Sequence, residues 1–166
     1  MILYVNREKV AYVNNKTLLN INEFLPYQLV ALSSKVSEDF SHVYIAHGGL
    51  TQAQWRVLAH VLNTQELGST AKQICELANM DKSTVSRAIK QLEEKKLIRL
   101  TQHENDKRAM VVTVTDAGCA LYQDITPKAL DWESELLSCL QDDEQKQLKG
   151  LISKLSSYIA IKDSTD

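Results

Sequence analysis

The chain has 166 residues, of which 44% are hydrophobic, enough for one domain with a sizeable core. No apolar run approaches the roughly 18 residues of a membrane span, and the N-terminus lacks the pattern of a signal peptide, so we expect a cytoplasmic protein without a membrane anchor. The formal net charge of −2 argues against a generally basic nucleic-acid binder, and no HExxH, GxSxG, glycine-rich phosphate loop or paired-carboxylate motif predicts an enzyme, a cofactor or a metal site.

Charge is nevertheless distributed unevenly along the chain. Residues 69–109 hold nine Lys and Arg against six Asp and Glu, a net charge of +3, which leaves −5 for the rest of the sequence. This segregation predicts one face that tolerates an anionic partner on an otherwise acidic protein.

The N-terminal third predicts an arm followed by a long helix. Residues 1–21 contain short β-leaning runs, LYV and VAYV, which fit a small hairpin, an extended arm or a poorly ordered terminus. From Asn22 to near Gly48, apolar residues recur with a helical period, and Pro26 falls in the first turn, where a missing N–H costs little. The apolar positions of this helix are Leu25, Leu29, Leu32, Val36, Phe40 and Val43.

Three shorter helices follow, each opened by a capping residue. Thr51 and Gln54 have the spacing of a capping box, as do Thr70 and Gln73, and Asp81 is a favourable N-cap. The last two helices are short and joined by a tight turn, which predicts a helix-turn-helix. Their apolar faces consist of Ala71, Ile74, Cys75 and Ala78 in the first helix and Val85, Ala88, Ile89 and Leu92 in the second.

The apolar period then changes from helical to alternating. Residues 97–101 and 111–115 read as two strands separated by a polar loop, and a β-hairpin directly after a helix-turn-helix is the layout of a winged helix. A long helix begins after Thr115, and a last helix begins at Asp142 with three acids in its first turn, where the helix dipole favours negative charge.

The predicted fold is mainly α with a small β-hairpin wing: a winged helix-turn-helix flanked by N- and C-terminal dimerisation helices. Residues 1–21 form the arm, 22–50 and 116–166 the helical dimerisation region, and 51–115 the DNA-binding region, within one compact domain overall. The small winged-helix core cannot cover all the apolar stripes of the terminal helices, so we predict a homodimer.

The second helix of the helix-turn-helix carries short hydroxyls and long cations on its outer face. Hydroxyls form hydrogen bonds to phosphates or base edges at close range. The paired N–H donors of an Arg guanidinium match the acceptors of phosphate or of guanine. For this helix stretch alone, the alternative is an ordinary solvent-exposed helix start with a good N-cap. For Asp106 and Arg108 in the wing loop, the alternative is an exposed ion pair that contributes little stability. The candidate DNA-contacting residues are Thr70, Ser83, Thr84, Ser86, Arg87, Lys90, Asp106, Lys107 and Arg108.

The sequence resembles the MarR family of bacterial transcription regulators. The matching segments are LTQAQWRVLAHV, DKSTVSRAIKQLEEKKLI and NDKRAMVVTVTDAG, in the family's order. The resemblance implies a mainly helical homodimer that binds a pseudo-palindromic operator in double-stranded DNA, with an Asp-x-Arg pair in the wing, matched here by Asp106 and Arg108.

The resemblance also implies a small-molecule effector, because family members commonly respond to small aromatic or phenolic acids or their acyl-CoA thioesters. Arg56 and His60 share one helix face and would bind a carboxylate, with Ser34 and Tyr27 adding polar contacts. A structural hydrogen bond or an interhelical ion pair is the alternative for each of these residues. The branch that senses oxidants is disfavoured, because no cysteine precedes Cys75.

These observations predict a sequence-specific DNA-binding transcription regulator, a homodimeric repressor released by such an acid or thioester. Two alternatives remain: a winged-helix module that binds another protein, and a MarR-like regulator without a small-molecule ligand. The polar, cationic helix face counts against the first alternative.

Overall fold

The computed structural model describes residues 11–13, 16–64, 68–102 and 109–163. By its internal contacts the chain divides into two compact units, Met1–Gln52 and Ala53–Asp166, and each is described by itself. None of the helices within the described residues has both the length and the hydrophobicity of a membrane-spanning segment.

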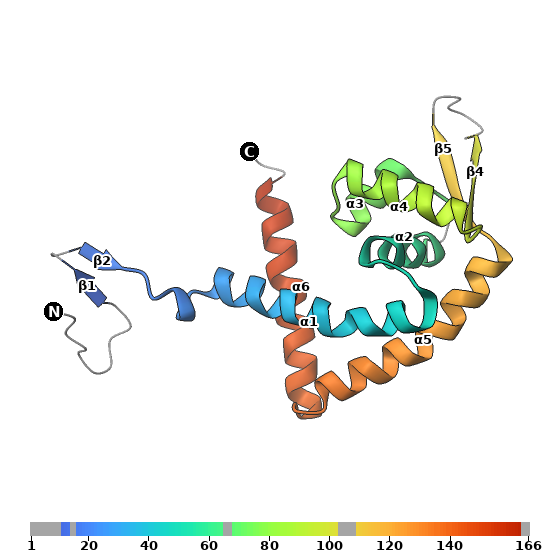
Figure 1. Ribbon diagram of the computed structural model, residues 1–166. Helices are drawn as coiled ribbons and strands as arrows, with labels where there is room; N and C mark the ends of the chain where they lie inside the picture. Colours follow the sequence, from blue (N-terminus) through green and yellow to red (C-terminus); the bar gives the residue numbers. More distant parts are fainter. Residues whose placement is uncertain (1–10, 14–15, 65–67, 103–108, 164–166) are drawn as a thin grey trace. The chain divides into compact units, whose positions relative to one another are not determined.

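The first unit consists of a hairpin followed by a long helix (Figure 1). Strands β1 (Ala11–Val13) and β2 (Lys16–Leu18) pair antiparallel, so the described part of the N-terminal arm is a hairpin. A single 3-10 turn, η1 (Ile21–Glu23), precedes α1 (Leu25–Gly48), which therefore begins three residues later than the periodicity predicts. Gly49 ends α1 in the left-handed region with φ 55°, and its N–H donates to the Ile45 carbonyl at 2.9 Å.

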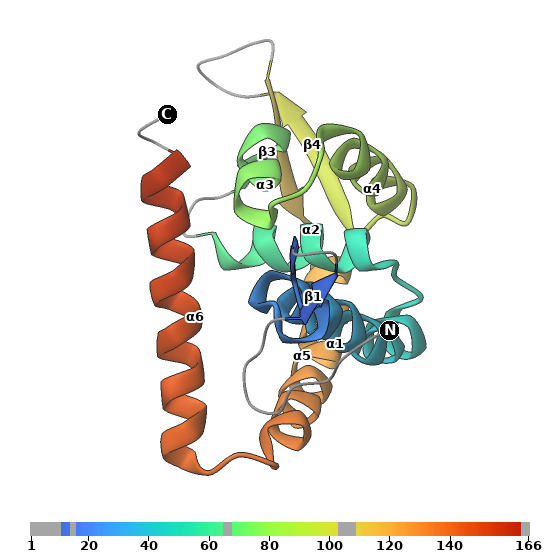
Figure 2. The ribbon, with the colours of Figure 1, turned by 90° about the vertical axis from the view of Figure 1, so that its left-hand side faces the viewer.

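Three helices of the second unit build the core of the winged helix. They are α2 (Gln52–Asn63), α3 (Ala71–Ala78) and α4 (Lys82–Glu94), and Figure 2 shows α3 and α4 beside the strands that follow them. The apolar face predicted for α4 is confirmed, since all four of its residues are buried. The core residues of these three helices are Val57, Leu58, Val61, Ile74, Ala78, Val85, Ala88, Ile89 and Leu92.

A three-stranded antiparallel sheet completes the winged helix. Strands β4 (Ile98–Gln102) and β5 (Met110–Val114) form the predicted hairpin, with Leu100 opposite Val112. The short strand β3 (Ser69–Thr70) pairs with the other edge of β5 and gives the order β3-β5-β4. The periodicity did not predict β3, because two residues are too few to show an alternation.

Two long helices end the chain. Helix α5 (Asp116–Leu137) begins at the Thr115 cap, whose hydroxyl accepts the Gly118 N–H at 3.1 Å. Within this unit, Trp55 of α2 stacks on Tyr122 of α5 with ring centroids 5.4 Å apart.

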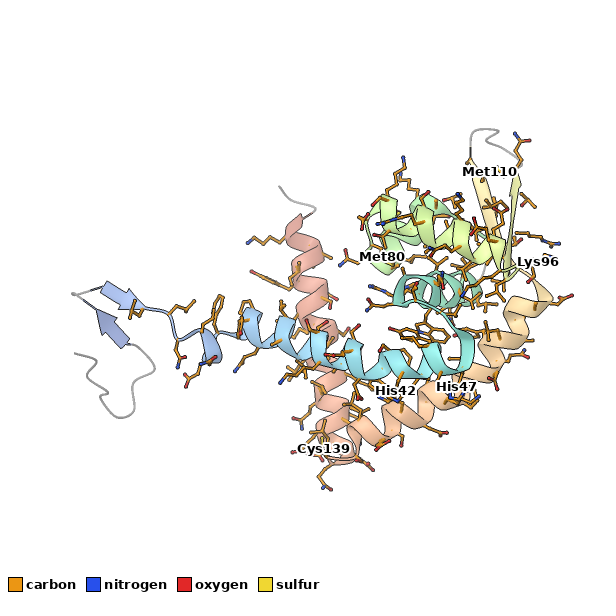
Figure 3. The ribbon with its side chains drawn as sticks, in the orientation of Figure 1. His42, His47, Met80, Lys96, Met110 and Cys139 are labelled. Atoms are coloured by element: carbon orange, nitrogen blue, oxygen red, sulfur yellow. The ribbon has the colours of Figure 1, made fainter. Side chains whose placement is uncertain are left out.

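Helix α6 (Asp142–Asp163) has the three predicted acids in its first turn, and Cys139 lies in the connection before it (Figure 3). Its apolar side chains are uncovered in the single chain. They are Leu148, Leu151, Ile152, Leu155, Tyr158, Ile159 and Ile161.

Candidate nucleic-acid interface

The sequence between α3 and α4 forces a sharp turn. Thr70 caps α3 in a complete capping box with Gln73, as predicted. At the other end, Asn79 adopts the left-handed conformation with φ 47°, a region that Asn tolerates better than most residues. The Met80 N–H donates to the Cys75 carbonyl at 3.0 Å and closes the turn, where Figure 3 labels Met80. The chain is thereby redirected within three residues into α4.

Helix α4 separates its core residues from its polar ones. Val85 and Leu92 have no solvent-accessible surface. The predicted contact residues Ser83, Ser86 and Arg87 are exposed, whereas Thr84 is half-buried. The first two turns of α4 therefore present a small, polar and cationic surface beyond a fully apolar inner face.

The hydroxyls at the start of α4 are already engaged within the protein. Asp81, the N-cap, accepts the Thr84 N–H at 2.9 Å, the Ser83 hydroxyl at 2.6 Å and the Thr84 hydroxyl at 2.6 Å. These hydrogen bonds, the one from the Ser83 side chain first, hold the pKa of the Asp81 carboxyl far below its usual value. Asp81 is therefore ionised throughout the neutral pH range.

The two cations of α4 remain on its outer face. The Arg87 Nε donates to the Ser83 carbonyl at 3.3 Å, which lays the guanidinium along the first turn. Lys90 lies 4.0 Å from Glu94, with both side chains mostly exposed. An exposed pair at this distance contributes little stability, so Lys90 is readily available to another anion.

Helix α2 makes polar links to both helices of the helix-turn-helix. The Gln54 side chain is buried, and its Nε2 donates to Gln91 Oε1 of α4 at 2.8 Å. Arg56 Nη2 donates to the main-chain carbonyl of Ala78 at the end of α3. Neither link follows from helical periodicity, which predicts only which residues share a face.

The wing is described at its base. The Arg99 Nε of β4 donates to the Thr113 hydroxyl of β5 at 3.1 Å, which adds a cation to the exposed side of the sheet. Lys96 and Met110 mark opposite ends of the hairpin in Figure 3. The three candidate residues of the wing loop, Asp106, Lys107 and Arg108, lie outside the described residues.

Comparison with known proteins identifies the family. Residues 48–109 match the model of the MarR family. YwoH of Bacillus subtilis, an uncharacterized HTH-type transcriptional regulator, is 31% identical over 86% of this chain and 95% of its own length. The chain belongs to the MarR family. The alignment with a second relative, YwaE of the same organism, covers 53% of this chain and about half of that regulator, 52%, at 34% identity.

Solved structures of other proteins have the same fold. A MarR/EmrR family regulator from Acinetobacter sp. ADP1 superposes with a TM-score of 0.76, at 29% identity, over 86% of this chain and 99% of that one. MepR of S. aureus, solved in a complex with DNA, gives a TM-score of 0.72 at 24% identity over 81% and 98% of the two chains. The Acinetobacter protein is described as a transcriptional regulator.

The four predicted effector-binding residues of this MarR-family chain are divided between the two units, two in each. In the second unit, Arg56 makes the structural bond to Ala78, and burial, followed by the charge of Arg56, lowers the pKa of His60. In the first unit, Ser34 donates to the Val30 carbonyl at 3.0 Å, and Tyr27 is half-exposed.

Ser34 also lies in an open groove along one face of α1. This groove belongs to the first unit and is mostly polar. It is lined by Ser33, Ser34, Ser37, Glu38, Ser41, Tyr44 and Gln52.

Proposed function

We propose that this MarR-family regulator binds double-stranded DNA with the N-terminal half of α4 in the major groove. The observation that carries the proposal is the outer face of α4, where Ser83, Ser86, Arg87 and Lys90 are exposed beside a buried apolar face. In helix-turn-helix proteins, the first residues of the second helix enter the groove. MepR, which shares the fold, was solved with DNA, and this supports the proposal.

The proposed interface extends beyond α4. Thr70 lies at the start of α3, where the first helix of such a motif crosses the phosphate backbone. A wing Arg held by a nearby Asp suits the narrow minor groove, and this is the role proposed for Asp106 and Arg108, with Lys107 beside them. Residues 51–115 then form the DNA-binding region.

The regulator acts as a homodimer in this proposal, with residues 22–50 and 116–166 as the dimerisation region. Helix α6 supports it, because Leu151, Ile152 and Ile159 expose more than half of their surface in the single chain. A second copy is a suitable partner because symmetric pairing is the common way to cover such a face. Two copies of α4 would then read two half-sites about 34 Å apart on a pseudo-palindrome.

Sedimentation measurements test the dimer. Leu155→Asp places a charge in the uncovered face of α6 and is expected to shift the protein toward monomer, whereas Lys146→Ala on the same helix is the matched control. An unchanged dimer in Leu155→Asp would contradict the use of this face.

The regulator is proposed to be a repressor that a small aromatic or phenolic acid, or its thioester, releases from DNA. An effector acts by favouring a dimer geometry in which the two copies of α4 no longer match successive major grooves. Arg56 is central to this step, since a carboxylate would compete with the Ala78 carbonyl for its guanidinium. Because Ala78 lies at the end of α3, that exchange would reach the helix-turn-helix directly.

A thermal-shift screen with aromatic acids and their CoA thioesters tests the effector. A binder of the native state raises the melting temperature by linkage, and Arg56→Gln should abolish the shift. A shift that survives in Arg56→Gln would place the carboxylate elsewhere.

The salt dependence of binding to a random duplex tests DNA binding itself. Phosphate contacts give a linear fall of log K with log salt, so a clearly negative slope is expected. A slope near zero would instead favour the alternative of a protein-binding module.

A further inference from the structure

The Asp81 carboxylate determines which hydrogen-bonding groups α4 can offer to a partner. An ionised carboxylate only accepts, so the Ser83 and Thr84 hydroxyls must both donate to it. Each hydroxyl has a single proton, and that proton is used in a bond of 2.6 Å. Both hydroxyls are therefore left with oxygen lone pairs alone for any further partner.

These bonds are strong enough to persist in a complex. Hydrogen bonds to a charged acceptor are shorter and about twice as strong as neutral ones. The Thr84 N–H also donates to Asp81 at 2.9 Å, which fixes the carboxylate in position as the helix cap. Turning a hydroxyl proton outward would leave the carboxylate with one fewer donor.

We propose that Ser83 and Thr84 act toward DNA only as hydrogen-bond acceptors, and so read the exocyclic amino groups of cytosine or adenine rather than contact phosphate. This inference rests on the proposed function. In the major groove only cytosine N4 and adenine N6 donate, whereas guanine O6 and N7 and thymine O4 accept. Phosphate oxygens also only accept, and the negative charge of Asp81 repels them.

This assignment divides the polar face of α4 by chemistry. Arg87 and Lys90 carry donors only, and they are the groups suited to phosphate or guanine. Ser83 and Thr84 supply the complementary acceptors nearer the start of the helix. The operator is thus expected to have a cytosine or adenine at the base that each of these two hydroxyls faces.

A single substitution should relax one of the two preferences. In Asp81→Asn the amide oxygen must keep the position that accepts the Thr84 N–H, since an N-cap requires an acceptor there. The amide NH₂ then faces the Thr84 hydroxyl, which accepts from it and has its own proton free to donate outward. The Thr84 hydroxyl keeps one free lone pair beside its free proton, so the base facing it should broaden from cytosine or adenine to all four bases, while the base facing Ser83 stays the same.

The test is selection of bound duplexes from a randomised library with the full chain at fixed salt. Thr84→Val identifies the position that Thr84 reads and should reduce its preference by about tenfold. Glu93→Gln, which makes the same change of charge on α4, should leave every preference unchanged. The urea midpoint of Asp81→Asn confirms that the variant is folded.

Two results would overturn the inference. One is identical base preferences for Asp81→Asn and the unmodified protein. The other is a Thr84→Val variant that weakens all duplexes equally and has a smaller salt slope, which would be a phosphate contact. If the unmodified protein selects no sequence at all, the proposed function fails first, so the two failures are distinguishable.

Discussion

The side-chain hydrogen bond between Gln54 of α2 and Gln91 of α4 can be removed from either end. Its removal should lower the free energy of unfolding more when the exposed Gln91 is changed than when the buried Gln54 is changed. Gln54 is 3% exposed, whereas Gln91 lies on the exposed side of α4. In Gln54→Leu, an apolar side chain of similar size fills the buried site, and the Gln91 amide turns to water. In Gln91→Leu, the buried Nε2 of Gln54 loses the acceptor that it bonds at 2.8 Å.

The magnitudes follow from this asymmetry. Loss of an ordinary hydrogen bond whose remaining partner is solvated costs about 0.5–1.5 kcal/mol, and the apolar burial of leucine offsets part of it. A buried donor deprived of its acceptor costs about 1–3 kcal/mol. We therefore expect the free energy of unfolding to fall by about 1 kcal/mol or less in Gln54→Leu and by roughly 2 kcal/mol in Gln91→Leu.

Urea unfolding measures the free energy of unfolding of both variants. The protein concentration is kept fixed, because the stability of a protein that associates varies with concentration. The double variant should lose less than the sum of the two single losses, since both ends of one bond are removed. A larger loss in Gln54→Leu than in Gln91→Leu would refute the reasoning and show that Gln54 stabilises the protein mainly through other contacts.

Three further changes test the packing and the pH response. Val85→Ala should lower the free energy of unfolding by about 1–3 kcal/mol in urea, because it leaves a void beneath α4. Gly118→Ala places a Cβ against the Leu97 carbonyl oxygen and should lower the melting temperature by several degrees. The lowered pKa of His60 predicts that stability falls as the pH drops through its ordinary value of 6.5, since the unfolded chain takes up the proton more readily; His60→Gln should reduce that slope in a series of pH-dependent melts.

The residues of α4 show why the helix-turn-helix could be predicted from sequence. Val85 and Leu92 recur with the helical period and are buried, and Asp81 has the side chain that an N-cap requires. These are local signals, contained within a few residues. The helix order, the wing hairpin and the capping box at Thr70 follow from the same kind of signal, and the structure confirms them.

The side-chain hydrogen bonds of α2 could not be predicted, because they join residues that are distant in sequence. Gln54 and Gln91 are 37 positions apart, and no local pattern shows that the two amides meet. Arg56 and His60 are spaced so that both could bind one ligand, yet the described hydrogen bond of Arg56 goes to the main-chain carbonyl of Ala78, 22 positions away.

Chemistry within one turn was also missed. The sequence predicts Ser83 and Thr84 as polar contacts, but only the geometry around Asp81 shows that their hydroxyl protons are already used in hydrogen bonds. Periodicity predicts that a side chain faces outward. It does not predict whether that side chain still has a hydrogen-bond donor free for another partner.

The most direct test of the central claim is the affinity of Arg87→Ala for a selected operator duplex at fixed salt. We expect a loss of about ten- to a hundredfold, because Arg87 carries the only guanidinium on the described outer face of α4. Lys146→Ala, which removes the same charge from α6, should leave the affinity nearly unchanged. An Arg87→Ala variant that binds the operator as tightly as the unmodified protein would contradict the assignment of α4 as the DNA-reading helix.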